Sequence, residues 1–427
     1  MTTRGARFSG IATTVLVTAL AALFILNLSL GDKTIDRRVE TLYAVADPQF
    51  PRTMGALLGP ALVPGNRAVA LVNGDEIFPA MLKTIRAAQH TVDFETYIYW
   101  SGTIGKTFAD ALSERARAGV RVSVLLDWVG SGKLDERLLE AMKSSGVEVQ
   151  RYNRPRWYNL GRLNNRTHRK LLVVDGRIGF TGGVGIADEW MGDAQDPEHW
   201  RDTHFQVEGP VVAQMQAAFL DNWMEVTGAV RHGREYFPPL APVGTEYAQV
   251  FLSSPGGGSE SMQLMYLLSI AAARSTIRLS ASYFVPDDVA IATFVAALKR
   301  GVRVQMILPG PHMDAEIVRR ASRARWGELL RAGAEIYEYQ PAMFHCKVMV
   351  VDDLWTSAGS TNFDNRSFAV NDEANLNIYD GAFARAQTGI FDEDLRQSRR
   401  ISLAEWEQRP WVEKLWEHTV GLLGSQL

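Results

Sequence analysis

Two stretches of this chain repeat one arrangement of histidine, lysine and aspartate. Both read His-x-Lys-x4-Asp, and a pair of small residues follows each aspartate at the same distance. A single copy would be no more informative than a basic strand edge, but two copies in register predict a duplicated half-site. The repeated residues are His168, Lys170 and Asp175 in the first copy and His345, Lys347 and Asp352 in the second.

The residue types in the repeat suit chemistry on a phosphodiester. Apolar runs at 171–174 and 348–351 follow each pair and predict strands, in which residues i and i+2 share a face. When the halves meet, one imidazole can attack phosphorus and the other, protonated, can donate to the leaving alkoxide. The lysines would neutralise the non-bridging oxygens. We therefore expect neither a metal nor a cofactor, and the other histidines have no metal-ligand spacing.

Four carboxylates accompany the repeat, and we expect them to have two different roles. Asp175 precedes Gly176 in a hairpin-turn dipeptide, so we interpret Asp175 and Asp352 as structural groups that fix a turn. Asp202 and Glu373 lie downstream at similar separations and could orient the histidines. We assign Asp202 to His168 and Glu373 to His345, although spacing alone does not exclude two solvated carboxylates.

Strands and helices alternate around both copies, which predicts an α/β layered fold. Residues 91–99 are rich in β-branched and aromatic types, 104–118 have helical periodicity, and 119–122 and 301–304 share the pattern Gly-Val-Arg-Val. We expect two pseudo-two-fold related α/β/α sandwich domains with one active site between them. The predicted division is an N-terminal transmembrane anchor (1–31), a stem (32–67), a first domain (68–230), a proline-containing linker (231–245) and a second domain with a C-terminal helical segment (246–427).

The N-terminal segment and the overall composition restrict the class of protein. Residues 10–30 carry no charge, and about 20 helical residues span a bilayer. A cleaved signal peptide is the alternative, but the residues that follow make a poor cleavage site, so we favour a single-pass anchor in the cell membrane. Basic residues flank the segment almost equally, which leaves the orientation open. The net charge of −3 argues against a nucleic-acid binder.

The repeat resembles the defining motif of the phospholipase D superfamily, His-x-Lys-x4-Asp-x6-Gly-Ser-x-Asn, which occurs twice in its members. The second copy matches throughout, including Ser360 and Asn362, whereas the first has Gly183 and Gly185 at the last two positions. The resemblance implies that Gly183, Ser360 and Asn362 help to bind the substrate phosphate. With glycine at the asparagine position, the first half would hold phosphate through Lys170 and backbone amides.

Within the superfamily the chain is most similar to bacterial cardiolipin synthases, on segments such as 182–189, 200–204, 282–286 and 360–367. This implies that His168 is the nucleophile and His345 the general acid, although the residues alone permit the reverse. It also implies phospholipid substrates, phosphatidylglycerol above all, at a membrane, with no nucleic acid and no required protein partner. Hydrolysis in place of transfer, and a phosphodiesterase nuclease, remain alternatives that share the same site.

Overall fold

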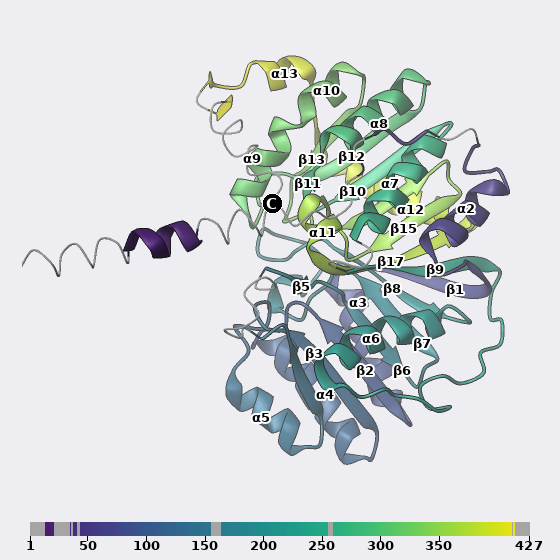
Figure 1. Cartoon of the computed structure of the whole chain (residues 1–427), viewed down its shortest axis with the longest axis vertical. Coiled ribbons are helices and arrows are strands. Elements are labelled where there is room, and N and C mark those ends of the chain that lie inside the picture. The colour runs from purple at the N-terminus through teal and green to yellow at the C-terminus, as the bar shows by residue number, and fades with distance from the viewer. Residues whose placement is uncertain are drawn as a thin grey trace, which may run out of the picture.

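The structure is a computed structural model in which the two sequence halves form two lobes stacked along the long axis (Figure 1). It describes residues 13–20, 35, 37–40, 43–154, 164–254, 259–411 and 413–414. A short helix, α2 (Gln49–Leu58), precedes the first lobe. The two-lobed arrangement agrees with the α/β class that the sequence predicts.

The first lobe follows the predicted alternation closely. Its helices are α3 (Asn73–Ala87), α4 (Thr103–Arg117), α5 (Glu136–Ser144) and α6 (Val212–Thr227), with a short 3-10 turn η2 (Asp188–Trp190). Its strands are β1 (Val63–Val72), β2 (Thr91–Thr96), β3 (Arg121–Asp127), β4 (Glu148–Tyr152), β5 (Arg166–Thr167), β6 (Leu171–Val174), β7 (Ile178–Gly182) and β8 (Thr203–Glu208).

The second lobe repeats this order with additions at its C-terminal end. Its helices are α7 (Ser259–Ala272), α8 (Asp288–Lys299), α9 (Glu316–Ala324), α10 (Trp326–Arg331), α11 (Asn365–Ala369), α12 (Gly381–Arg396) and α13 (Leu403–Glu407). Its strands are β9 (Glu246–Ser253), β10 (Thr276–Ala281), β11 (Phe284–Val285), β12 (Arg303–Pro309), β13 (Glu335–Tyr339), β14 (Lys347–Val351), β15 (Trp355–Gly359), β16 (Phe363–Asp364), β17 (Asn371–Tyr379) and β18 (Ser398–Ile401).

The sheets of the two lobes are joined edge to edge. Within the described residues, 16 strands form one sheet in the order β18-β13-β12-β10-β14-β15-β17-β9-β1-β8-β7-β6-β2-β3-β4, with β5 paired to β17. The join is the antiparallel contact of β1 with β9, whose register shifts between Val63 and Asn66. The expected pair of sandwiches therefore shares a continuous sheet, which crosses the middle of the molecule in Figure 1.

Helices cover both faces of this sheet because the buried strands present apolar side chains on both sides. In β6, Leu172 and Val174 belong to the core under α3 and α4, whereas Leu171 and Val173 face the core that contains α6. That second core also includes Phe383 of α12, so the two lobes share one apolar layer. The shared layer fixes how the two repeats face each other.

The predicted anchor falls mostly outside the described residues. Residues 13–20 are helical, and their apolar side chains are exposed. In the part of the chain that the structure describes, no helix combines the length and the apolar character needed to cross a membrane.

Candidate active site

His168 is held by a carboxylate that belongs to the other lobe. It follows β5, and its Nδ1 lies 2.9 and 3.0 Å from the two carboxylate oxygens of Glu373 on β17. The Ser360 hydroxyl donates to Oε2 of Glu373 at 2.5 Å and so fixes that carboxylate from behind. The Tyr97 ring packs edge-on against the imidazole. This arrangement leaves Nε2 of His168 as the ring nitrogen that can meet a substrate.

His345 has the reciprocal arrangement with a shorter carboxylate. Its Nδ1 lies 2.7 Å from Oδ2 of Asp202, a residue of the first lobe. The Trp190 indole N–H donates to the same oxygen at 3.0 Å, and the Thr203 backbone N–H donates to Oδ1. Trp190 and Trp200 both contact the imidazole ring. His345 therefore lies in a more apolar environment than His168.

This pairing corrects the assignment made from sequence. Asp202 had been expected to orient His168 and Glu373 to orient His345, but the structure exchanges the partners between the lobes. The backbone explains the exchange, because β5 pairs with the start of β17 and the His168 N–H donates to Asp372 O. In the same way, the His345 N–H donates to Arg201 O. Each histidine loop thus runs beside the segment that carries the other lobe's acid.

The lysines lie on the same faces as their histidines, as the two-residue spacing predicts. Lys170 Nζ donates to the His168 carbonyl at 2.8 Å, and Lys347 Nζ donates to the His345 carbonyl at 2.7 Å. Lys347 also lies 3.1 and 3.2 Å from the two ring nitrogens of His345. Both ammonium groups are therefore buried beside the imidazoles with their own backbone as the nearest acceptor.

Burial dominates the electrostatics of the four basic groups. It lowers the pKa of His168 to about 4 and that of His345 to about 3, although Glu373 and Asp202 each oppose the effect. It also lowers the pKa of Lys170 to about 7 and lowers that of Lys347. Each imidazole senses the lysine of the other lobe, so the two half-sites form one electrostatic unit.

The two orienting carboxylates remain charged despite complete burial. Burial alone would raise the pKa of Glu373, but His168, Lys170 and Ser360 outweigh it, and the pKa is lowered. The pKa of Asp202 is lowered in the same way by His345 and Lys347, against burial. When both imidazoles are neutral, the negative charges of the two carboxylates balance the positive charges of the two lysines. An anionic substrate would then favour a proton on one of the rings.

The motif aspartates lie at the far end of their strands from the histidines. Asp175 accepts hydrogen bonds from the backbone N–H groups of residues 89–91 at the start of β2. Asp352 accepts from those of residues 274–276 at the start of β10. Both have a left-handed backbone, with φ of 53° and 54°. Each carboxylate thus ties a hairpin turn to the neighbouring strand, as expected for a structural group.

The chain is similar to known cardiolipin synthases. A family model described as "Cardiolipin synthase, PLD-like domain" matches residues 81–223 and 266–395. Cardiolipin synthase 2 of Bacillus anthracis is 35% identical over 360 residues, covering 84% of this chain and 70% of that protein. Cardiolipin synthase of Geobacillus thermodenitrificans is 36% identical over 366 residues, covering 85% and 72%.

The chain belongs to the phospholipase D-like cardiolipin synthase family. A solved structure, phosphatidylserine synthase of Haemophilus influenzae Rd KW20, matches the fold with a TM-score of 0.66. The match covers 88% of this chain and all of that chain, at 14% identity. It therefore bears on the fold and supports the two-lobed phospholipase D-like architecture.

Two residues of the second motif copy, Ser360 and Asn362, differ in the hydrogen-bonding groups that remain for a phosphate. Its single O–H points at Glu373, and its oxygen accepts from the Ala374 N–H, so no donor is left for a phosphate. Asn362 is better placed, because its Oδ1 accepts from Ser282 and the amide nitrogen remains as the donor. In this structure the Ser360 hydroxyl therefore supports Glu373.

The first copy of the motif has no room for side chains at Gly183 and Gly185. A Cβ at Gly183 would lie 2.3 Å from Oδ1 and 2.5 Å from Oδ2 of Asp202. A Cβ at Gly185 would lie 2.8 Å from Ile98 and 3.2 Å from the Trp190 ring. In the first copy, Asp202 and Trp190 therefore occupy the space that the motif gives to serine and asparagine side chains.

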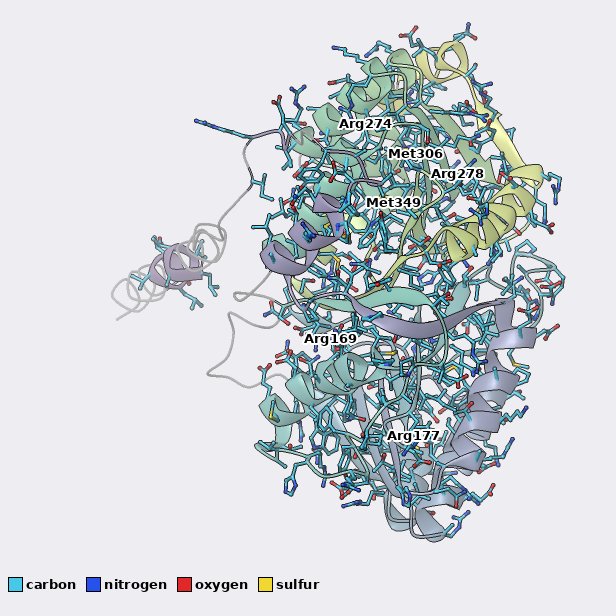
Figure 2. All side chains as sticks on the ribbon, turned by 90° about the vertical axis from the view of Figure 1, so that its right-hand side faces the viewer. Arg169, Arg177, Arg274, Arg278, Met306 and Met349 are labelled. Atoms are coloured by element: carbon cyan, nitrogen blue, oxygen red, sulfur yellow. The ribbon has the colours of Figure 1, made fainter. Side chains whose placement is uncertain are left out.

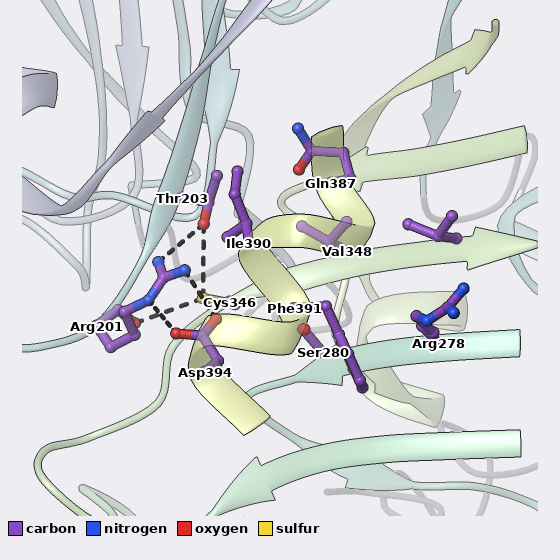
Figure 3. Close-up of a pocket in the computed structure, with 11 residues that line it drawn as sticks. Arg201, Thr203, Arg278, Ser280, Cys346, Val348, Gln387, Ile390, Phe391 and Asp394 are labelled. Carbon is purple, nitrogen blue, oxygen red and sulfur yellow. Dashed lines mark hydrogen bonds and ion pairs between the residues drawn. The ribbon is translucent and has the colours of Figure 1, made fainter. Parts of the chain in front are cut away.

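The variable residues between each histidine and lysine are buried in both copies. Arg169 lies where the two lobes meet (Figure 2) and donates to Ala218 O, Ser254 and Asp221. Cys346 lies beside Arg201, which forms a bidentate ion pair with Asp394 (Figure 3). Cys346 is 1% exposed, in agreement with the prediction that it is a buried small residue.

Sequence reasoning missed Trp190, Tyr97 and Ser282, which contact the motif residues directly. The one signal in the sequence was glycine at positions 183 and 185 of the first copy, which leaves space for a large side chain from elsewhere. In the part of the chain described here, no group of three or more His, Cys, Asp or Glu side chains could hold a metal ion.

Proposed function

We propose that this chain is a cardiolipin synthase that transfers a phosphatidyl group from one phosphatidylglycerol to the hydroxyl of another phospholipid. The observation that carries the proposal is the pair of crossed His–carboxylate units, His168–Glu373 and His345–Asp202, each with a buried lysine. A double displacement at phosphorus needs one imidazole as a nucleophile and a second as a proton carrier. Family membership at 35% identity supports the choice of substrate class.

In the first half-reaction, Nε2 of His168 attacks the phosphorus of phosphatidylglycerol. A P–N bond forms while the P–O bond to glycerol breaks, and His345 delivers its proton to the departing alkoxide oxygen. Glu373 accepts the hydrogen bond from Nδ1–H of His168 and stabilises the positive charge that develops on the ring. Glycerol leaves, and the phosphatidyl group stays on His168.

In the second half-reaction, the hydroxyl of the acceptor lipid attacks the phosphohistidine. His345, now neutral, removes the hydroxyl proton, the new P–O bond forms, and His168 leaves with its electron pair. One phosphodiester replaces another, so no nucleotide is consumed. Water in the acceptor position would give hydrolysis, so exclusion of water determines the product.

The charge balance of the site supports a monoanionic diester as the substrate. Lys170 and Lys347 are buried, and burial lowers the pKa of both. A phosphodiester anion between them would stabilise their charged forms and favour protonation of His345, which begins with a pKa of about 3. Substrate binding would therefore prepare the general acid.

A location at the membrane surface follows from the same proposal. Donor and acceptor are both lipids, and the uncharged segment of residues 10–30 is long enough to hold the catalytic lobes at a bilayer. Arg154, next to Trp128, follows β4, and Arg366 lies in α11, where it donates to Asn164; both could meet anionic headgroups. The single-pass anchor thus remains part of the proposed function.

The deciding experiment gives the purified full chain phosphatidylglycerol in detergent micelles and identifies the products by mass spectrometry. Cardiolipin and glycerol in equal amounts are expected. Phosphatidic acid as the main product would replace the proposal with a phospholipase D-type hydrolase. Adding phosphatidylethanolamine as a competing lipid then reports which donor and acceptor are preferred.

A further inference from the structure

The carboxylate that orients His345 has a partner that the family motif does not specify. The Trp190 indole N–H donates to Oδ2 of Asp202 at 3.0 Å, and the same oxygen meets Nδ1 of His345 at 2.7 Å. Trp190 is 1% exposed, and its ring lies edge-on to the imidazole with centroids 5.2 Å apart. One side chain therefore contacts both members of the pair.

The other half-site performs the same task with a motif residue. There, the Ser360 hydroxyl donates to Oε2 of Glu373, the oxygen that also lies 3.0 Å from Nδ1 of His168. In the first copy the serine position is Gly183, where a Cβ would collide with Asp202. A serine cannot support this shorter carboxylate from that position, so the donor must come from another direction.

We propose that Trp190 is a positioning residue that replaces the missing motif serine and sets the proton affinity of the Asp202–His345 pair. The effect on catalysis rests on the proposed function, whereas the effect on the pKa of His345 depends only on the hydrogen bond from the Trp190 indole N–H to Asp202. The η2 turn holds the indole in place, because Asp188 of that turn accepts from the backbone N–H groups of Thr103 and Ile104 at the start of α4.

The expected direction follows from the charge on Asp202. A donor to a carboxylate weakens its pull on the Nδ1 proton, so loss of the indole N–H should raise the pKa of His345. The other groups that face this imidazole are Lys347, Lys170 and the ring of Trp200. Both lysines oppose protonation and stay in place when only the indole changes, so they do not alter the sign.

The test replaces Trp190 by its benzothiophene isostere, which keeps the ring and its packing but has sulfur in place of N–H. The His345 ring is titrated by nitrogen-15 nuclear magnetic resonance on the full chain in micelles, with saturating inorganic phosphate as the anion. Its signal is assigned by its loss in His345→Gln. The titration should move to higher pH by about one unit, the size expected for one hydrogen bond to a charged group.

A matched control separates this effect from the loss of any buried indole bond. Trp326 is also 1% exposed, and its N–H donates to Ser322 at 3.0 Å in the core of the second lobe. The same isostere at Trp326 should leave the His345 titration unchanged. If the Trp190 isostere also gives an unchanged titration, Trp190 only fills space and the proposal is wrong. The titration requires no turnover, so a failure of the proposed function leaves this result interpretable.

Discussion

The two half-sites have the same backbone plan and different side-chain surrounds. His168 meets a long carboxylate, Glu373, that Ser360 supports, whereas His345 meets a short one, Asp202, that Trp190 supports. Tyr97 lies beside the first imidazole and two tryptophans beside the second. Duplication therefore preserved the catalytic groups, while the residues that tune them diverged.

Despite their different environments, both half-sites start with a neutral imidazole. Burial lowers the pKa of both rings, to about 4 for His168 and about 3 for His345, so both are neutral at pH 7 without an anion. A neutral ring is what a nucleophile needs, whereas the acid must gain its proton when substrate binds. Because each acid partner comes from the opposite lobe, neither lobe can assemble a complete half-site alone.

Removing either histidine should have the largest effect and should distinguish the two roles. We expect His168→Ala and His345→Ala each to lower phosphatidyl transfer by at least about 10⁴-fold, because nucleophile and acid act on the same bond changes. With a diester whose nitrophenolate leaving group needs no proton, His345→Ala should still form the lipid adduct and trap label. The measurement is radiolabelled lipid that stays on denatured protein.

The same assay can also show the reverse assignment of nucleophile and acid. His168→Ala has no nucleophile and should trap nothing with either diester. Label on His168→Ala and none on His345→Ala would assign the nucleophile to the second lobe. His345 would then be the nucleophile and His168 the general acid.

Neutralising the crossed carboxylates should have the next largest effect. Glu373→Gln and Asp202→Asn keep the size of each side chain but remove the charge that stabilises an imidazolium, so we expect a loss of about 10³-fold in kcat for each. With the nitrophenyl diester, Glu373→Gln should still slow adduct formation, whereas Asp202→Asn should slow it far less. If the first assay places the label on His168, the opposite order would mean that each acid serves the histidine of its own lobe.

That crossing marks the limit of what the sequence predicts. Residues 171–174 and 348–351 are short, continuous apolar runs, so β6 and β14 follow from the local sequence. The partner of His168 instead depends on which lobe supplies the strand beside β5, and similar separations along the chain cannot tell one lobe from the other. The glycines at 183 and 185 are visible as departures, but the side chain that fills their space is known only from the fold.

The buried arginines beside the two half-sites should differ in what they contribute to stability. Arg201 is 4% exposed in its side chain and pairs with Asp394, which is 6% exposed, so Asp394→Ala leaves a buried cation unpaired. We expect it to lower the free energy of unfolding by about 3–5 kcal/mol. Asp221, the partner of Arg169, is 54% exposed, and Asp221→Ala should lower it by less than about 1 kcal/mol. Chemical denaturation of the full chain in detergent measures both.

Loss of the Ser360 hydroxyl should give the smallest effect of these changes, and it tests the support of Glu373 alone. Ser360→Ala removes one donor from Glu373 while leaving the carboxylate and His168 in place, so we expect about a tenfold loss in kcat with little change in KM. Ser357→Ala is the matched control, because that buried hydroxyl accepts from Asn375 and does not contact Glu373. A rise in KM with kcat unchanged would instead support a phosphate-binding role for Ser360. A phosphate ligand acts on substrate binding, whereas a support for Glu373 acts on the attack by His168.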